Sequence, residues 1–231
     1  MRLVSLVAKF TTMSLLAGFS SVSIAADAGT IQQLNGNVTI TDANKVTRKA
    51  SAKERIQSGD TITTEAKSET LIKMADDSTV VLRPNTQFQF TEFNYNKAPT
   101  DSSFVTLLRG TARMVTGLIG RQNVANVRVN TQTATIGIRG TDFEVAVIPE
   151  DTADTRAGVY NLVHDGATNI KLAQSDKSLD VKKNQTAFAP DKPKPGEEPL
   201  QILRETPIFL RTGGGLDALI QSITIQIPMF R

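Results

Sequence analysis

Short runs in which apolar and polar residues alternate recur along most of this 231-residue chain. Alternation with period 2 is typical of a β-strand that buries one of its faces. Residues that favour turns separate the runs, as at Asn35-Gly36, Pro84-Asn85, Arg109-Gly110 and Asp165-Gly166. The pattern predicts a β-rich body over residues 30–189, with strands near 37–41, 60–64, 69–74, 78–83, 86–90, 104–108, 112–115, 126–130, 159–163 and 185–189.

Strands of this length, spaced about 8–12 residues apart, favour a compact all-β fold. A sandwich, a jelly-roll-like fold and a short β-solenoid all fit the pattern. An outer-membrane barrel would need strands of about 10 residues and aromatic girdles. The runs are shorter than that, and the chain has no Trp and two Tyr, so we exclude the barrel.

One run, TATIGIRGTDFEV at residues 133–145, changes its period. Ile136 and Ile138 occupy even positions, whereas Phe143 and Val145 occupy odd ones. An unbroken strand would send these two pairs to opposite faces. We therefore predict a bulged or bent strand at Arg139-Gly140, where glycine tolerates the left-handed backbone that a bulge often needs.

The last forty residues differ from the body. Residues 190–199, PDKPKPGEEP, hold four Pro and mixed charges, which predicts an extended Pro-rich linker. In the C-terminal tail, residues 200–231, the apolar residues Leu216, Leu219, Ile220, Ile223 and Ile227 have helical spacing, whereas Ile223, Ile225 and Ile227 alone would suit a strand. The tail either packs on its own β domain or docks on a partner.

The N-terminus has the pattern of a secretory signal peptide at residues 1–25. Arg2 and Lys9 precede an apolar run that ends in small residues around Ala25. The pattern predicts export, with no transmembrane span in the mature chain. The expected location is the periplasm, with the cell surface or secretion as alternatives.

The composition of the chain argues against several classes of function. The net charge of +3 includes Arg2 and Lys9, so removing these two basic residues leaves +1, and no basic run indicates a nucleic-acid partner. The chain has no Cys and one His, which argues against thiol chemistry and a zinc site. We expect no cofactor and no metal.

Three blocks in order resemble the FecR domain, a periplasmic β module. They are residues 59–90, LLRGTARM at 107–114 and VRVNTQTATIGIRGTDFEV at 127–145. The resemblance extends over about 36–148, and its sharpest motif is Gly137, Arg139, Gly140, Thr141 and Phe143, which we interpret as structural.

Two departures from the family concern turn positions. The family commonly has Asp-Gly-Ser where this chain has Asp76-Asp77-Ser78, and often Pro where Gln132 stands. A third departure bears on function, because family members that control sigma factors carry a cytoplasmic segment and a transmembrane helix before the domain. Here a signal peptide precedes it directly, so the sigma-regulating role is not carried over.

The resemblance also implies a chemical hypothesis, because some sigma-regulating members cleave themselves at this Gly-Thr bond. The hydroxyl of Thr141 would attack the carbonyl carbon of Gly140, and the resulting ester would hydrolyse. Such a hydroxyl needs a base nearby, and the sequence names none. We favour a structural bulge with an uncleaved chain over self-cleavage.

Other candidate sites are weak. His164 lies beside Asp165-Gly166 in an expected hairpin turn, and a Ser-His-Asp triad would have to use it. Glu150, Asp151 and Asp154 gather in one loop but lack calcium-loop spacing. We read the first as a turn residue and the second as a solvated loop.

The expectation is thus an exported, non-enzymatic module for protein interaction or ligand sensing in envelope signalling. Its partner would be another envelope protein or a cell-wall component. The alternative is a structural or accessory protein of the cell surface or of a secreted matrix.

Overall fold

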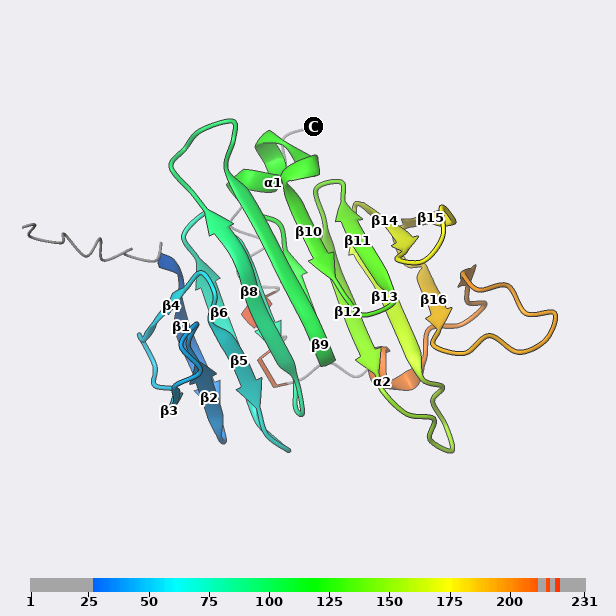
Figure 1. Cartoon of the computed structure of the whole chain (residues 1–231), viewed down its shortest axis with the longest axis horizontal. Helices are drawn as coiled ribbons and strands as arrows, with labels where there is room; N and C mark the ends of the chain where they lie inside the picture. Colours follow the sequence, from blue (N-terminus) through cyan, green and yellow to red (C-terminus); the bar gives the residue numbers. More distant parts are fainter. Residues whose placement is uncertain (1–26, 212–214, 217–218, 221–231) are drawn as a thin grey trace, which may run out of the picture.

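The structure is a computed structural model that describes residues 27–211, 215–216 and 219–220 (Figure 1). It confirms the all-β prediction, since strands dominate and the helices are short. The predicted signal peptide lies outside the described residues, as do Ile223, Ile225 and Ile227 of the tail. Two stacked sheets form a sandwich, and we call them the front sheet and the back sheet after their positions in Figure 1.

The front sheet holds the strands that face the viewer in Figure 1. In spatial order it consists of β3 (Thr47–Lys49), β2 (Val38–Thr41), β5 (Thr61–Thr64), β8 (Gln87–Asn94), the first half of β9 (Ser102–Val115), β10 (Val127–Asn130), β11 (Ala134–Ile138), β14 (Ala167–Leu172) and β15 (Ser178–Lys182). The pair β9–β10 is parallel.

The back sheet lies behind it and is entirely antiparallel in its described pairings. Its order is β4 (Arg55–Gln57), β1 (Asp27–Asn35), β6 (Glu69–Met74), β7 (Thr79–Leu82), the second half of β9, β12 (Asp142–Ile148), β13 (Gly158–Asp165), β16 (Thr186–Pro190) and β17 (Gln201–Ile202).

The chain repeatedly changes sheet, and residues with positive φ mark the crossing points. Successive strands of one sheet need only a hairpin, but a crossing needs a sharp corner, which left-handed backbone provides. The residues with positive φ at these corners are Gly36, Lys53, Gly59, Lys67, Asn85, Gly110, Gly140, Gly166 and Asn184.

Strand β9 is shared by both sheets. Its residues up to Arg109 pair with β8 and β10 in the front sheet, and those from Gly110 pair with β7 and β12 in the back sheet. The sequence predicts a turn at Arg109-Gly110, and this is wrong. Gly110, at φ +85°, bends the strand without ending it, because hydrogen bonding continues on both sides of the bend.

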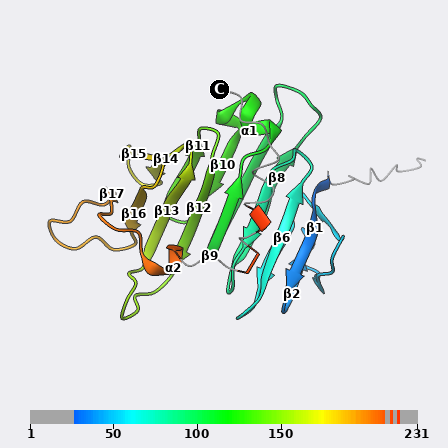
Figure 2. The ribbon, with the colours of Figure 1, turned by 180° about the vertical axis from the view of Figure 1, so that it is seen from behind.

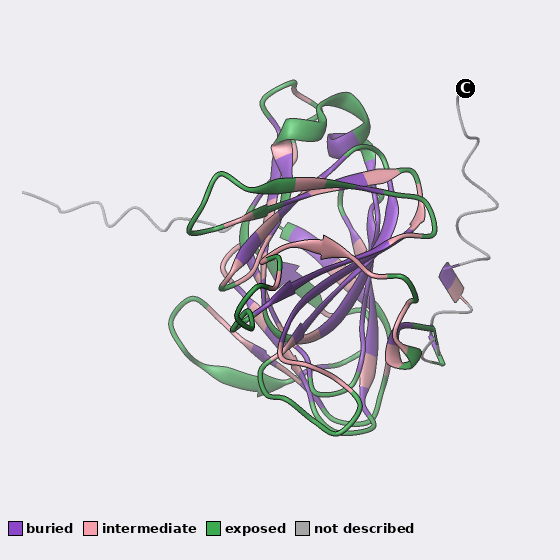
Figure 3. Ribbon diagram, turned by 90° about the vertical axis from the view of Figure 1, so that its right-hand side faces the viewer, coloured by how far each residue is buried: buried purple, intermediate pink, exposed green. Residues whose placement is uncertain are grey.

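The main core lies between the sheets (Figure 3). The alternating apolar residues of both sheets point inward, and Phe88, Phe90 and Phe143 are among the largest side chains that are fully buried. Between β9 and β10, the short helix α1 (Leu118–Gln122) and the 3-10 turn η1 (Val124–Asn126) close one end of the sandwich. Ile119 from α1 joins the core.

The described residues of the C-terminal segment, 203–211, 215–216 and 219–220, lie against the outer face of the back sheet (Figure 2). Leu210 of α2 (Ile208–Arg211) is buried against Ala146, Tyr160, Leu162 and Phe188. Leu216 and Ile220 pack on Leu71, Val81 and Val115. The described part of the tail therefore covers its own domain. Residues 191–199 of the predicted linker lead the chain back to the same sheet, because β17 pairs with β16.

Candidate functional site

The family motif forms one corner of the sandwich. Strand β11 ends at Ile138 in the front sheet, and β12 begins at Asp142 in the back sheet. Ile136 points into the core from one layer and Phe143 points into it from the other, and both are fully buried. The change of period predicted a bulged or bent strand. In the structure it marks a corner that ends one strand and starts the next in the opposite sheet.

Gly140 occupies this corner for its backbone conformation. Its φ is +70°, and an added Cβ would find no atom within 4 Å. Crowding is therefore not the reason for glycine, whereas the left-handed backbone is. The neighbouring Arg139 is exposed and pairs with Asp180 at 3.3 Å.

A second corner, at Gly166, touches the first. An added Cβ on Gly166 would lie 2.2 Å from the carbonyl oxygen of Gly140 and 2.9 Å from Cγ2 of Thr141. The expected hairpin at Asp165-Gly166 is wrong, because β13 and β14 belong to different sheets. The two corners pack against each other, and a side chain at Gly166 would displace the corner at Gly140.

Thr141 is buried and anchored by Thr116. The backbone N–H of Thr141 donates to Thr116 Oγ1 at 3.0 Å, and Thr116 donates to the Thr141 carbonyl from its backbone N–H and its hydroxyl, each at 2.9 Å. The two hydroxyl oxygens lie 3.4 Å apart. Among the residues that the structure describes, no carboxylate, imidazole or amine hydrogen-bonds the Thr141 hydroxyl, so self-cleavage at Gly140–Thr141 stays a hypothesis that awaits a base.

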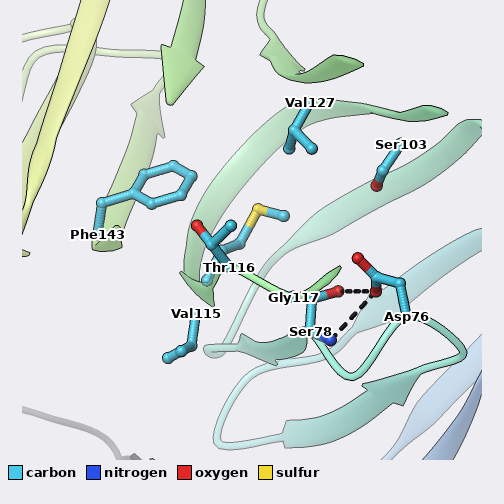
Figure 4. Close-up of a pocket in the computed structure, with 9 residues that line it drawn as sticks. Asp76, Ser78, Ser103, Val115, Thr116, Gly117, Val127 and Phe143 are labelled. Atoms are coloured by element: carbon cyan, nitrogen blue, oxygen red, sulfur yellow. Dashed lines mark hydrogen bonds between the residues drawn. The ribbon is translucent and has the colours of Figure 1, made fainter. Parts of the chain in front are cut away.

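A hollow of about 270 Å³, its open mouth included, adjoins this corner (Figure 4). Its lining comes from the β6–β7 turn, β9, β10 and β12 and consists of Asp76, Ser78, Ser103, Met114, Val115, Thr116, Gly117, Val127 and Phe143. Its one carboxylate, on Asp76, accepts hydrogen bonds from the Ser78 hydroxyl at 2.6 Å and from the Ile119 N–H at 3.3 Å. The carboxylate holds the turn against α1, which is a structural task.

The same turn explains one departure from the family. Asp77 has φ +67°, a conformation that glycine adopts without strain and that Asp tolerates better than most residues. The glycine that the family commonly has at this position would therefore suit the turn that Asp76-Asp77-Ser78 forms here.

The other sequence candidates lie apart from the corner. Within the loop 149–157, Asp151 accepts a hydrogen bond from the Ala157 N–H. In the described residues, no three side chains of His, Cys, Asp or Glu are grouped to hold a metal. His164 does not lie in a hairpin tip but on the outer face of β13, where its Nε2 is 3.4 Å from Glu144.

Sequence reasoning missed a buried ionic cluster around Glu144. Its members, Arg83, Arg113, Asp142, Glu144 and His164, lie on the outer face of the back sheet. Arg83 Nη2 contacts the Glu144 carboxylate at 2.9 Å, and Arg113 binds Asp142 through two nitrogens at 2.9 and 2.7 Å. Arg83 also donates to the carbonyl of Phe209 at 3.1 Å. These residues alternate with the core residues of their strands, which places them on the outer face. From the sequence alone this position indicates exposure to solvent, because the segment that covers the face is not yet known.

The motif and the sandwich together define a FecR-type β domain. The model of the family described as FecR protein matches residues 60–167, so this part of the chain is a FecR domain. The match begins later than the resemblance seen in the sequence and extends further, into β14. No curated protein matches the chain.

Two similar solved structures are of one candidate anti-sigma factor from Parabacteroides distasonis ATCC 8503. Each is 16% identical, with a TM-score of 0.49, over 65% of this chain and 62% of the other. This chain thus spans less than two thirds of their length. A cell surface anchoring domain is 26% identical over 27% of this chain and 82% of its own, with a TM-score of 0.26. In the described residues of this protein, no helix has the length and apolar character needed to cross a membrane.

Proposed function

We propose that this FecR-domain protein is exported and acts without catalysis in envelope signalling, as a module for protein interaction or ligand sensing. The family match supports a signalling role. The signal-peptide pattern at residues 1–25 supports export to the periplasm.

The observation that carries the proposal is the difference between the two sheet faces. The outer face of the back sheet is covered by the described residues of the C-terminal segment and has a buried ionic cluster beneath them. The front sheet exposes its outer face across nine strands, and no described segment crosses it (Figure 1). A rigid scaffold with one face closed and one face open is suited to holding a partner.

A site-specific photo-cross-linker tests this in living cells. Placed at Thr63 or Thr135 on the open face, it should give a discrete adduct in the periplasmic fraction. Thr152, in the loop 149–157 at an edge of the molecule, is the matched control position and should give none. The proposal fails if the open face gives no adduct or if the protein stays in the cytoplasm. An adduct with a large secreted surface protein would instead indicate a structural role at the cell surface.

A further inference from the structure

Gly137 has no structural reason to be glycine. It lies inside β11 on the outer face of the front sheet, and its φ is not positive. An added Cβ would meet nothing closer than the carbonyl oxygen of Asn169, at 3.9 Å. A glycine inside a strand costs stability and often marks a place where a ligand approaches the backbone. The fold therefore leaves open the space that a side chain at residue 137 would fill, and we call this space the notch.

A straight row of uncharged polar side chains lies beside the notch. Register pairs connect six half-buried residues on six neighbouring strands: Thr41, Thr61, Gln89, Thr106, Asn130 and Thr135. With strands about 4.8 Å apart, the row is roughly 24 Å long. It runs across the strands and ends next to Gly137.

The row is ordered before any ligand arrives. Thr135 donates to Asn130 at 3.2 Å, and the hydroxyls of Thr41 and Thr106 bond the neighbouring Thr47 and Thr91, each at 2.8 Å. A hydroxyl offers one donor and two acceptor positions, so each retains capacity for a ligand. Side chains that are already fixed lose little entropy on binding.

Two cations near the row are paired with carboxylates, and a third, Arg128, is the register partner of Gly137 and stacks on an aromatic ring. Arg139 pairs with Asp180, and Lys171 pairs with Asp176. The guanidinium of Arg128 lies 4.9 Å from the ring centre of Phe104. Leu108, next but one to Thr106, is 47% exposed and adds an apolar contact. This face complements a ligand that is neutral, rich in hydroxyl or amide groups, and extended.

We propose that the outer face of the front sheet, centred on Gly137, binds a linear uncharged glycan chain along this row. An extended peptide would need free backbone groups at a sheet edge, and here the ladder already uses them. Hydroxyl and acetamido groups of sugars match the Thr, Gln and Asn side chains, and one sugar ring enters the notch. The inference rests on the proposed sensing function and names its ligand class.

Binding of the purified mature protein to insoluble cell-wall sacculi and to linear hexasaccharides of N-acetylglucosamine and of glucose tests it. Heparin serves as the charged probe. We expect saturable binding to at least one neutral glycan and none to heparin. Gly137→Val fills the notch and should weaken binding at least tenfold, while its thermal unfolding midpoint stays equal or rises. The double variant Gln89→Ala/Thr106→Val should weaken binding too, which guards against a folding defect in the first.

Thr152→Val is the matched control, because Thr152 lies in the exposed loop between β12 and β13 of the back sheet, where it bonds Thr155, and it should leave binding unchanged. The inference is overturned if the protein binds none of the neutral glycans or binds heparin alone. It is also overturned if Gly137→Val binds as tightly as the parent protein. Because the cross-linking experiment in cells can succeed with a protein partner, its outcome separates failure of the glycan inference from failure of the sensing function.

Discussion

At the scale of single residues, Gly140 and Gly137 stand three positions apart and serve different ends. Gly140 is required by a left-handed backbone at a corner, whereas Gly137 has ordinary strand geometry and open space beside it. The sequence places both in one motif, because it gives neither the backbone φ of a glycine nor the space around it. The structure gives both and so distinguishes the two roles.

Substituting each glycine by Ala should therefore have opposite effects on stability. Gly140→Ala forces a Cβ into left-handed backbone and should lower the free energy of unfolding by about 1 kcal/mol. Gly137→Ala should raise it by roughly 0.5 kcal/mol. Urea unfolding of the two variants beside the parent protein measures both, and equal effects of one sign would refute the distinction.

The Gly140–Thr141 bond is expected to stay intact. The Thr141 hydroxyl has the Thr116 hydroxyl as its neighbour, and a neutral hydroxyl is a poor base at pH 7. Intact-mass measurement of the purified mature protein should give one full-length species. Two fragments that meet between Gly140 and Thr141 would show cleavage and a base that this geometry lacks.

At the scale of elements, the C-terminal segment is held by few side chains. Leu210 is buried to 2% exposure, while Ile208, two residues earlier, is 75% exposed. Leu210→Ala should cost about 3 kcal/mol, since it removes buried methyl groups and leaves a cavity. Ile208→Ala should cost close to nothing, and it is the matched control in the same urea experiment. Similar losses for both would mean that α2 does not cover the sheet in solution.

The ionic cluster beneath this segment makes a second comparison available. Glu144→Gln removes a buried carboxylate that Arg83 contacts at 2.9 Å, which should cost about 3 kcal/mol. Asp180→Asn breaks the pair with Arg139, where both side chains are about half exposed, and should cost less than about 1 kcal/mol. Thermal unfolding of both variants checks the difference. A Glu144 variant as stable as the Asp180 variant would show that the cluster is hydrated.

Strand positions were predictable here, but sheet membership was not. Period 2 placed strands such as 127–130 and 186–190 correctly because it reports local burial. It also flagged the corner at Gly140. It could not tell that Gly110 bends a continuous strand while Gly140 ends one, since that depends on which partner strands lie on each side. The buried charges of Arg113 and Glu144 stayed hidden for the same reason.

At the scale of the whole molecule, two ion pairs tie the loop 191–200 to the sandwich, and the more buried of them joins Glu197 to Arg156. Glu197 binds Arg156 through both carboxylate oxygens. The Arg156 hydrogen bond, helped by the backbone N–H of Lys194, lowers the pKa of Glu197 from 4.5 to about 2. The folded state thus holds this group ionised where the unfolded chain would protonate it.

Stability from this contact is fully present above about pH 4.5 and is lost as the pH falls toward 2. The thermal unfolding midpoint should therefore drop over this window, and it should drop less in Glu197→Gln. Glu198→Gln, one residue along with a side chain 73% exposed, should follow the parent curve. If the thermal unfolding midpoints of the parent protein and Glu197→Gln fell equally over this pH range, the lowered pKa of Glu197 would be contradicted.

Since β9 lies at the centre of both layers, the sandwich has no natural dividing line. A fragment that stops before Ser102 lacks the middle of each layer, and one that starts after Val115 lacks it as well. Neither half can assemble its share of the core unaided, so mixing two such pieces should restore the native fold only when one of them carries this strand complete. Inserted domains and tags are consequently tolerated at the outer loops and not near Gly110.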